Sequence, residues 1–381
     1  MLLLKNGLVY TMETDEAINT DILISDGKIL KIEEDISCEN AKKIDLSGKI
    51  VIPGLIDACS SIGLIEEGKK LVGDDINEKN ELILSDLKTK DGIYIWDNGF
   101  NDALKNGVTT AVITSGKMNV IGSQSCAIKT KNSSLEEMLV KDFVDLHIVL
   151  GDSPKKWNQG KQETPLSRMG IISLLRRTLI EARDYLENKK NKSISYLEYN
   201  AKYDAFESIF NNEVPLKITA HKAQDILAAV NIGNEFNIRV VINYGTEAYL
   251  VREVLKKYNI PVILGSCLTD KSSYDLINRK DSSGKILSGC GITTAVASNY
   301  PDVISSLLMI SAGIYAKAGM SHINVLKSVT IDPAKILGLD DRIGSIKVGK
   351  DADIIVFDDN PINSMAKVVM TILNGELTAC S

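Results

Sequence analysis

The chain carries few side chains that bind metals or transfer protons well, and most of them follow short apolar segments. Histidine occurs three times in 381 residues, at positions 147, 221 and 322. Six cysteines are scattered without a Cys-x-x-Cys pair, which is typical of reduced thiols rather than of a disulfide framework. Because a zinc site needs three or four N, S or O donors, this scarcity of histidine limits metal-dependent chemistry.

The elements that must position these side chains alternate along the middle of the chain, from about residue 53 to 341. Apolar runs such as residues 51–56, 239–243 and 261–264 are each followed by a polar or amphipathic stretch. A strand followed by a helix, repeated about eight times, predicts a parallel (β/α)8 barrel of the TIM type, an α/β fold.

Both ends of the chain are β-rich. Residues 1–52 contain turn signals such as Asp26-Gly27, and residues 342–381 contain the apolar run 354–357. We therefore predict that 1–52 and 342–381 form one composite β-sandwich domain, and that 53–341 form the barrel.

Barrel enzymes place their chemistry at the C-terminal ends of the strands. Cys59 could be a nucleophile or thiolate ligand, or a half-buried thiol; Asp152 could be a site carboxylate or a loop cap. His221 could be a ligand or general acid/base, or a histidine bonded to a carbonyl. We interpret His147 and His322 as structural. The candidate pocket residues are Cys59, Ser61, Asp152, Thr219, His221, Tyr244 and Asn299, and the weak metal-ligand candidates are Cys59, Asp152 and His221.

Charge and hydropathy exclude some partners. Lys and Arg (44) against Asp and Glu (50) give a net charge of −6 without a basic block, which argues against binding to nucleic acid or to an anionic membrane. No run reaches the roughly 18 apolar residues of a membrane span, and the first residues lack a signal-peptide pattern. We expect a cytoplasmic protein whose partner is a small-molecule ligand at the barrel mouth.

Two motifs resemble those of the amidohydrolase superfamily. Residues 51–61, Val-Ile-Pro-Gly-Leu-Ile-Asp-Ala-Cys-Ser-Ser, resemble its first barrel strand, V-x-P-G-L-I-D-x-H-x-H, and residues 344–353 resemble its C-terminal G-S-x-x-x-G-K-x-A-D. Residues 107–110, 119–122, 220–226 and 245–247 are similar to the imidazolonepropionase-like branch. The resemblance covers essentially the whole chain. It implies the barrel and composite sandwich, hydrolysis of non-peptide C–N bonds, one or two divalent metals (Zn or Fe), and often a homo-oligomer.

The ligands that the resemblance implies are substituted in this chain. The first-strand His-x-His falls on Cys59 and Ser61. The fourth-strand ligand falls on Asp152 or is missing, and the fifth-strand histidine on Thr219, or on His221 if the register shifts by two. The sixth-strand histidine falls on Tyr244, and the eighth-strand Asp, the general base, on Asn299.

These substitutions predict an amidohydrolase-family protein with a degenerate metal site, no cofactor, and little or no hydrolysis. Two alternatives stay open. One is an active hydrolase with an unusual centre made by Cys59, Asp152 and His221. The other is a non-enzymatic ligand-binding or scaffold protein that uses the same pocket.

Overall fold

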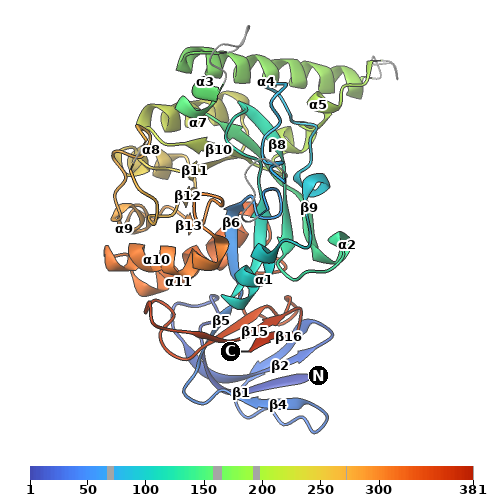
Figure 1. Ribbon diagram of the computed structural model, residues 1–381, viewed down its shortest axis with the longest axis vertical. Coiled ribbons are helices and arrows are strands. Elements are labelled where there is room, and N and C mark those ends of the chain that lie inside the picture. Colours follow the sequence, from blue (N-terminus) through green and yellow to red (C-terminus); the bar gives the residue numbers. More distant parts are fainter. Residues whose placement is uncertain (67–72, 158–164, 192–197, 272, 381) are drawn as a thin grey trace.

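The computed structural model describes residues 1–66, 73–157, 165–191, 198–271 and 273–380. A small β-domain lies at one end of the molecule, below a larger α/β domain, and both chain termini lie in the β-domain (Figure 1). This is the predicted arrangement of a barrel with a β-domain made by both ends of the chain. The predicted boundaries, at residues 52 and 342, stay a prediction.

The β-domain is one sheet in which C-terminal strands pair with N-terminal ones. Its order is β16-β15-β14-β5-β1-β2-β3, and β4 pairs with β1 on the side. The junction is the antiparallel pair β14 and β5, with Ile354 opposite Pro53. The strands are β1 (Leu2–Val9), β2 (Ile18–Ser25), β3 (Lys28–Glu33), β4 (Lys42–Asp45), β5 (Ile50–Pro53), β14 (Ile354–Phe357), β15 (Val368–Leu373) and β16 (Glu376–Cys380).

The barrel is a nearly closed sheet of eight strands in the order β13-β12-β11-β10-β9-β8-β7-β6. Just after β13, the Asn299 N–H donates to the Cys59 carbonyl at 2.9 Å, which ties the last strand to the first. The strands are β6 (Leu55–Ser60), β7 (Val108–Ile113), β8 (Ile121–Lys129), β9 (Leu139–Val149), β10 (Leu216–Ala220), β11 (Val240–Tyr244), β12 (Val262–Leu264) and β13 (Thr294–Val296).

One strand departs from the all-parallel barrel that the alternation predicts. Strand β8 runs antiparallel to both β7 and β9. Residues 114–120 join β7 to β8, and a crossover between parallel strands needs a dozen residues or more. The chain therefore returns as a hairpin, and β9 runs parallel to β10 again.

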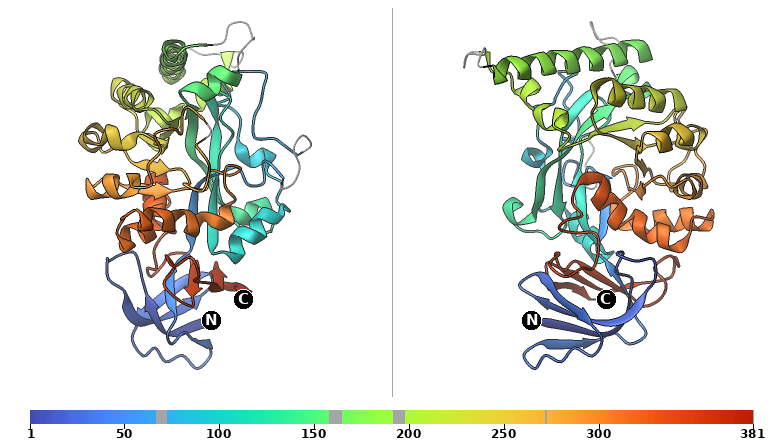
Figure 2. Two further views of the ribbon diagram at one scale, coloured as in Figure 1. Left: turned by 60° about the vertical axis from the view of Figure 1, so that its left-hand side comes forward. Right: turned by 180° about the vertical axis from the view of Figure 1, so that it is seen from behind.

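Helices cover the outside of the barrel, and the long α4 lies at the end of the molecule opposite the β-domain (Figure 2). The Ser167 side chain caps α4 by accepting from the Gly170 N–H. No helix among the described residues is long and apolar enough to cross a membrane. The helices are α1 (Asn98–Lys105), α2 (Leu135–Met138), α3 (Asp152–Trp157), α4 (Arg168–Lys190), α5 (Ala201–Asp204), α6 (Glu207–Phe210), α7 (Ala223–Phe236), α8 (Arg252–Lys257), α9 (Ser283–Gly289), α10 (Leu308–Lys317), α11 (His322–Ser328) and α12 (Ile331–Leu337).

The inside of the barrel changes from apolar to polar along the strands. Small and branched side chains from the earlier parts of the strands, such as Ala58, Val144 and Val241, pack together with α12. Asp145 and Asn243 lie further along two of these strands and are buried as well. Side chains alternate along a strand, and the C-terminal ends of the strands surround one mouth of the barrel. The polar groups therefore gather near that mouth.

Candidate functional site

The C-terminal strand ends surround a cavity of about 340 Å³, here called the Cys59 pocket. The structure brings five of the seven candidate residues to this cavity. It also adds His147 from β9 and Asn243 from β11, which the sequence analysis did not select. The lining includes Cys59, Ser61, His147, Thr219, Asn243, Tyr244 and Asn299, with Ser115, Lys117 and Lys156.

Neutral side chains in the Cys59 pocket are joined by hydrogen bonds. His147 Nε2 and Thr219 Oγ1 are 2.9 Å apart. Asn243 Nδ2 donates to Thr219 Oγ1 at 3.0 Å and to Cys59 Sγ at 3.5 Å. Asn299 Nδ2 donates to Asn243 Oδ1 at 3.3 Å. The groups at the strand ends therefore bond to one another, while Asn299 Oδ1 has no partner among the described residues.

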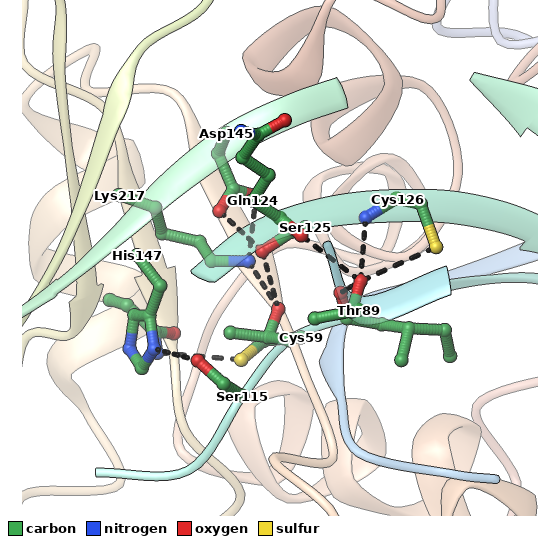
Figure 3. Close-up of polar contacts among 12 residues, drawn as sticks. Cys59, Thr89, Ser115, Gln124, Ser125, Cys126, Asp145, His147 and Lys217 are labelled. Carbon is green, nitrogen blue, oxygen red and sulfur yellow. Dashed lines mark hydrogen bonds and ion pairs between the residues drawn. The ribbon is translucent and has the colours of Figure 1, made fainter. Parts of the chain in front are cut away.

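A buried ion pair lies beside this chain of hydrogen bonds. Lys217 Nζ lies 2.8 Å from Asp145 Oδ2, and both side chains are fully buried. The ammonium group also donates to Thr114 Oγ1 at 2.6 Å, and Ser125 Oγ donates to Asp145 Oδ1 at 2.7 Å. Figure 3 shows Lys217 pointing toward Asp145 and Ser125, with Cys59 below them in the view. The barrel interior thus contains one fixed ion pair, in which each charge is compensated by the other.

The Cys59 thiol is a poor nucleophile in this setting. Burial raises its pKa, and the nearby Lys217 ammonium offsets this effect only in part. The thiolate is the form that attacks carbonyl groups and binds metals. Cys59 therefore stays protonated at neutral pH.

His147 and His221 are both held in the neutral form. Burial lowers the pKa of His147 to about 3, and the charges of Lys217 and Lys117 contribute to this shift. Burial and Lys117 likewise lower the pKa of His221 to about 3. A ring that stays neutral over the physiological range can hydrogen-bond, but it does not carry a proton at pH 7.

These shifts predict a loss of stability in weak acid. The folded protein keeps both rings neutral down to about pH 3, whereas a histidine in the unfolded chain takes up a proton near its ordinary pKa of 6.5. Below pH 6.5 the unfolded chain binds more protons, so the free energy of unfolding falls as the pH falls. The expected slope is about 1.4 kcal/mol per pH unit for each histidine.

Urea unfolding at pH 7.0 and 5.5 measures this loss. His147→Gln and His221→Gln should each lose about 1.4 kcal/mol less than the parent between these two values. His322→Gln is the matched control, because His322 bonds Asn360 at an exposed position that lines neither cavity of the barrel mouth. Equal losses in the parent and in both pocket variants would contradict the assignment of neutral buried rings.

The other two candidate residues lie outside the Cys59 pocket. His221 follows β10, its Nδ1 lies 2.8 Å from Thr246 Oγ1, and its ring packs on Tyr244 with centroids 4.6 Å apart. Asp152 begins α3 and forms ion pairs with Lys155 and Arg168. The structure therefore does not bring Cys59, Asp152 and His221 together as one centre.

Tyr244 forms a wall at the mouth of the pocket. Its Oη donates to Asp302, and Lys117 Nζ donates to Tyr244 Oη at 2.7 Å and to Asp302 at 2.8 Å. Tyr244 has a φ of 68°, a left-handed conformation that is costly for a bulky residue and is often retained at functional sites. Burial raises the pKa of Tyr244 well above its usual range, so the group remains a phenol.

The residues missed from the sequence share one signal. Asp145 and His147 on β9, and Lys217 on β10, are polar or charged positions that alternate with buried apolar ones. Asn243 lies opposite Thr219 in the β10–β11 register, so both face the same side of the sheet. Every second residue of a strand faces the same side of the sheet, and following that pattern along each strand would have selected these positions.

Comparisons with known proteins agree with this fold. A family model described as "Amidohydrolase family" matches residues 244–378. A solved amidohydrolase from Thermotoga maritima MSB8 is 32% identical, covers 100% of both chains and superposes with a TM-score of 0.96. The amidohydrolase tasK of Hapsidospora irregularis is 24% identical over 98% of this chain. This chain spans 42% of the length of tasK.

The expectation of no cofactor is wrong. Amidohydrolase relatives point to the use of divalent metals, among them an adenosine deaminase of Xanthomonas campestris solved with bound zinc. That deaminase has a TM-score of 0.58, is 15% identical, and the match covers 100% of this chain and 93% of the deaminase.

The residues of this pocket do not fit a zinc site of that kind. Within the described ranges, no three His, Cys, Asp or Glu side chains are grouped as a metal would require. Thr219, Asn243 and Asn299 are weak neutral donors, Cys59 is protonated, and the Asp145 carboxylate is already paired with Lys217. We therefore derive no catalytic step through a metal.

The fold, the strand-end pocket and the full-length match to the Thermotoga protein lead to one conclusion about ancestry. The β-domain from both termini, the nearly closed eight-stranded barrel and the 32% identity are found together in one chain. The expected resemblance is confirmed: this protein belongs to the amidohydrolase family.

Proposed function

We propose that this amidohydrolase-family protein binds a small molecule at the mouth of its barrel and hydrolyses amide-type bonds slowly at best. One observation carries the proposal: the strand ends present a hydrogen-bonded chain of neutral groups, from His147 through Thr219 and Asn243 to Asn299. Such groups can bind and orient a polar ligand. They include neither an ionised base nor an activated nucleophile.

The residue at the position of the general base, Asn299, supports slow hydrolysis. Asn299, which the resemblance aligns with the catalytic Asp, has a carboxamide that cannot accept a proton from water. His147 is neutral, but its Nε2 is already engaged with Thr219 Oγ1. A water molecule in this pocket would therefore keep close to its bulk acidity.

A covalent route through Cys59 has less support. Its sulfur accepts a hydrogen bond from the Asn243 amide at 3.5 Å, and no histidine is bonded to it among the described residues. Nucleophilic cysteines need an adjacent base or a lowered pKa, whereas burial raises the pKa of this thiol.

A hydrolysis screen tests the proposal. The purified protein, supplied with Zn, Mn or Fe, is assayed on lactams, cyclic imides and N-acyl compounds. The expected kcat/KM lies far below the roughly 10⁴–10⁸ M⁻¹s⁻¹ of ordinary enzymes. Rates inside that range on any of these substrates would overturn the proposal.

Two cysteine variants make the screen more specific. Cys59→Ala should leave the residual rate unchanged, as should Cys126→Ala, which removes a second buried cysteine that contacts Thr89 outside the pocket. Activity that disappears in Cys59→Ala but survives in Cys126→Ala would establish the covalent route instead.

A further inference from the structure

A second cavity, of about 480 Å³, adjoins the Cys59 pocket and is here called the Arg279 pocket. It lies beyond the ends of β11 and β12, beside the segment from Thr269 to Ser283, whose residue 272 is outside the described ranges. The Lys117, Tyr244 and Asp302 side chains line both cavities, as does Asn299. The hydrogen-bonded group of Tyr244, Lys117 and Asp302 therefore divides the barrel mouth into two compartments.

The Arg279 pocket contains an unusual concentration of unpaired buried polar atoms. Asp275 Oδ1, Asn299 Oδ1, Ser283 Oγ and Arg279 Nε have no hydrogen-bond partner in the described part of the chain. Asp275, Asn299 and Ser283 are only 7%, 4% and 3% exposed, and all of these residues line the cavity. Because buried polar groups in native proteins are nearly always paired, such a set in one cavity calls for polar partners, water or a ligand, that the protein itself does not supply.

The guanidinium of Arg279 is fixed in place but has a free donor. Its Nη1 donates to Thr269 Oγ1 at 2.5 Å, and its Nη2 donates to the carbonyls of Thr269 at 2.6 Å and Cys267 at 3.2 Å. No carboxylate forms an ion pair with it within the described ranges. Its Nε–H has no hydrogen-bond partner among the described residues.

The lining offers opposite charges to a ligand. Asp275 and Asn299 present unpaired acceptor oxygens, while Arg279 and Lys280 present positive charge. Lys280 Nζ also lies 4.5 Å from the centre of the Tyr249 ring. A ligand that carries both charges can contact both kinds of group at once, beyond the long-range effect of Lys156 and Lys222 on Asp275.

We propose that the Arg279 pocket binds a small zwitterion, whose ammonium group contacts Asp275 and Asn299 and whose carboxylate contacts Arg279 and Lys280. This inference rests on the proposed function and deepens it, because it names the class of ligand that enters the barrel mouth. Charge-assisted hydrogen bonds to both ends of one molecule explain why donors and acceptors are left open in the same cavity.

Isothermal titration calorimetry on the full chain tests the ligand class. The probes are α-amino acids and an ω-amino acid series from β-alanine to 6-aminohexanoate, which varies the distance between the two charges. At least one probe should bind, and its N-acetyl and carboxamide derivatives, each lacking one charge, should bind about 10- to 100-fold more weakly. Absence of binding by every probe, or equal binding of the singly charged derivatives, would overturn the proposal.

Matched variants test the residues. Asp275→Asn and Lys280→Met should each weaken the best probe about tenfold or more. Asp341→Asn and Lys285→Met make the same charge changes at exposed positions that do not line the cavity, and they should leave binding unchanged. Two test positions keep the experiment decisive if one variant fails to fold. Equal effects in the test and control variants would refute the assignment.

The two proposals fail in different ways. Calorimetry needs no turnover, so it is independent of the hydrolysis screen. Rapid hydrolysis together with zwitterion binding would overturn the proposal of slow hydrolysis and leave the ligand assignment intact. Slow hydrolysis without binding of any zwitterion would overturn the ligand assignment and leave slow chemistry intact.

Discussion

Lys217→Met is expected to lower the free energy of unfolding by about 3–5 kcal/mol, the size found when one partner of a fully buried ion pair is removed. The cause is the Asp145 carboxylate that remains. It would keep the 2.7 Å hydrogen bond from Ser125 but lose the cation 2.8 Å away, at a fully buried position. Urea unfolding at pH 7 measures the change.

Two further variants separate the charge from the packing. Adding Asp145→Asn to Lys217→Met removes the orphaned charge, so the double variant should be more stable than the single one. Lys90→Met breaks the ion pair with Asp142, which is partly exposed, and should cost less than about 1 kcal/mol. If Lys217→Met were no more damaging than Lys90→Met, the Asp145 carboxylate left behind would not carry the expected penalty of an unpaired buried charge.

The fold was accessible from the sequence because its signals are local. The apolar run at 354–357 forms β14 (Ile354–Phe357), and the run at 239–243 matches β11 (Val240–Tyr244) within a residue. Alternation of strands and helices is a property of neighbouring residues, so it can be read directly. The composite β-domain depended in addition on the resemblance of both terminal motifs to one family.

Strand direction and facing depend on long-range pairing, which local patterns do not encode. The hairpin that reverses β8 was missed because its apolar pattern is the same in either direction. His147 was interpreted as structural, yet it lies inside β9 and lines the Cys59 pocket. Lys217, a charged residue within a buried strand, can be understood only once Asp145 on the next strand is known to face it.

Asp152 illustrates the limit of the strand-end rule. Strand β9 ends at Val149, and Gly151, with a φ of 89°, turns the chain so that Asp152 begins α3. Its carboxylate then pairs with Lys155 one turn along the same helix. The turn at Gly151 and the ion pair with Lys155, rather than distance from the strand end, keep Asp152 out of the pocket, because Asn299 also lies three residues past its strand and lines it.

Placing histidine or aspartate at the five positions that the resemblance aligns with the family's ligands should create a zinc site. The five-fold variant of Cys59→His, Ser61→His, Thr219→His, Tyr244→His and Asn299→Asp is expected to bind zinc at least about a hundredfold more tightly than the parent. Loss of a single supporting group around a metal can have an effect of that size. All five positions line one cavity in this structure, so the new donors would converge. Competition with a chelator gives the affinity, and the rise in Tm on adding zinc gives an independent measure.

The register of β11 supplies a second form of this test. Asn243, not Tyr244, lies opposite Thr219, and Asn243 Nδ2 already bonds Thr219 Oγ1 at 3.0 Å. A variant with Asn243→His in place of Tyr244→His therefore puts its sixth-strand imidazole beside the fifth-strand one. If this variant binds zinc more tightly than the first, the sixth-strand ligand position is residue 243 and not residue 244. The interpretation that the family's ligands are substituted in this chain would then stand. If both variants fold, as judged by circular dichroism, and neither binds zinc more tightly than the parent, that interpretation is wrong.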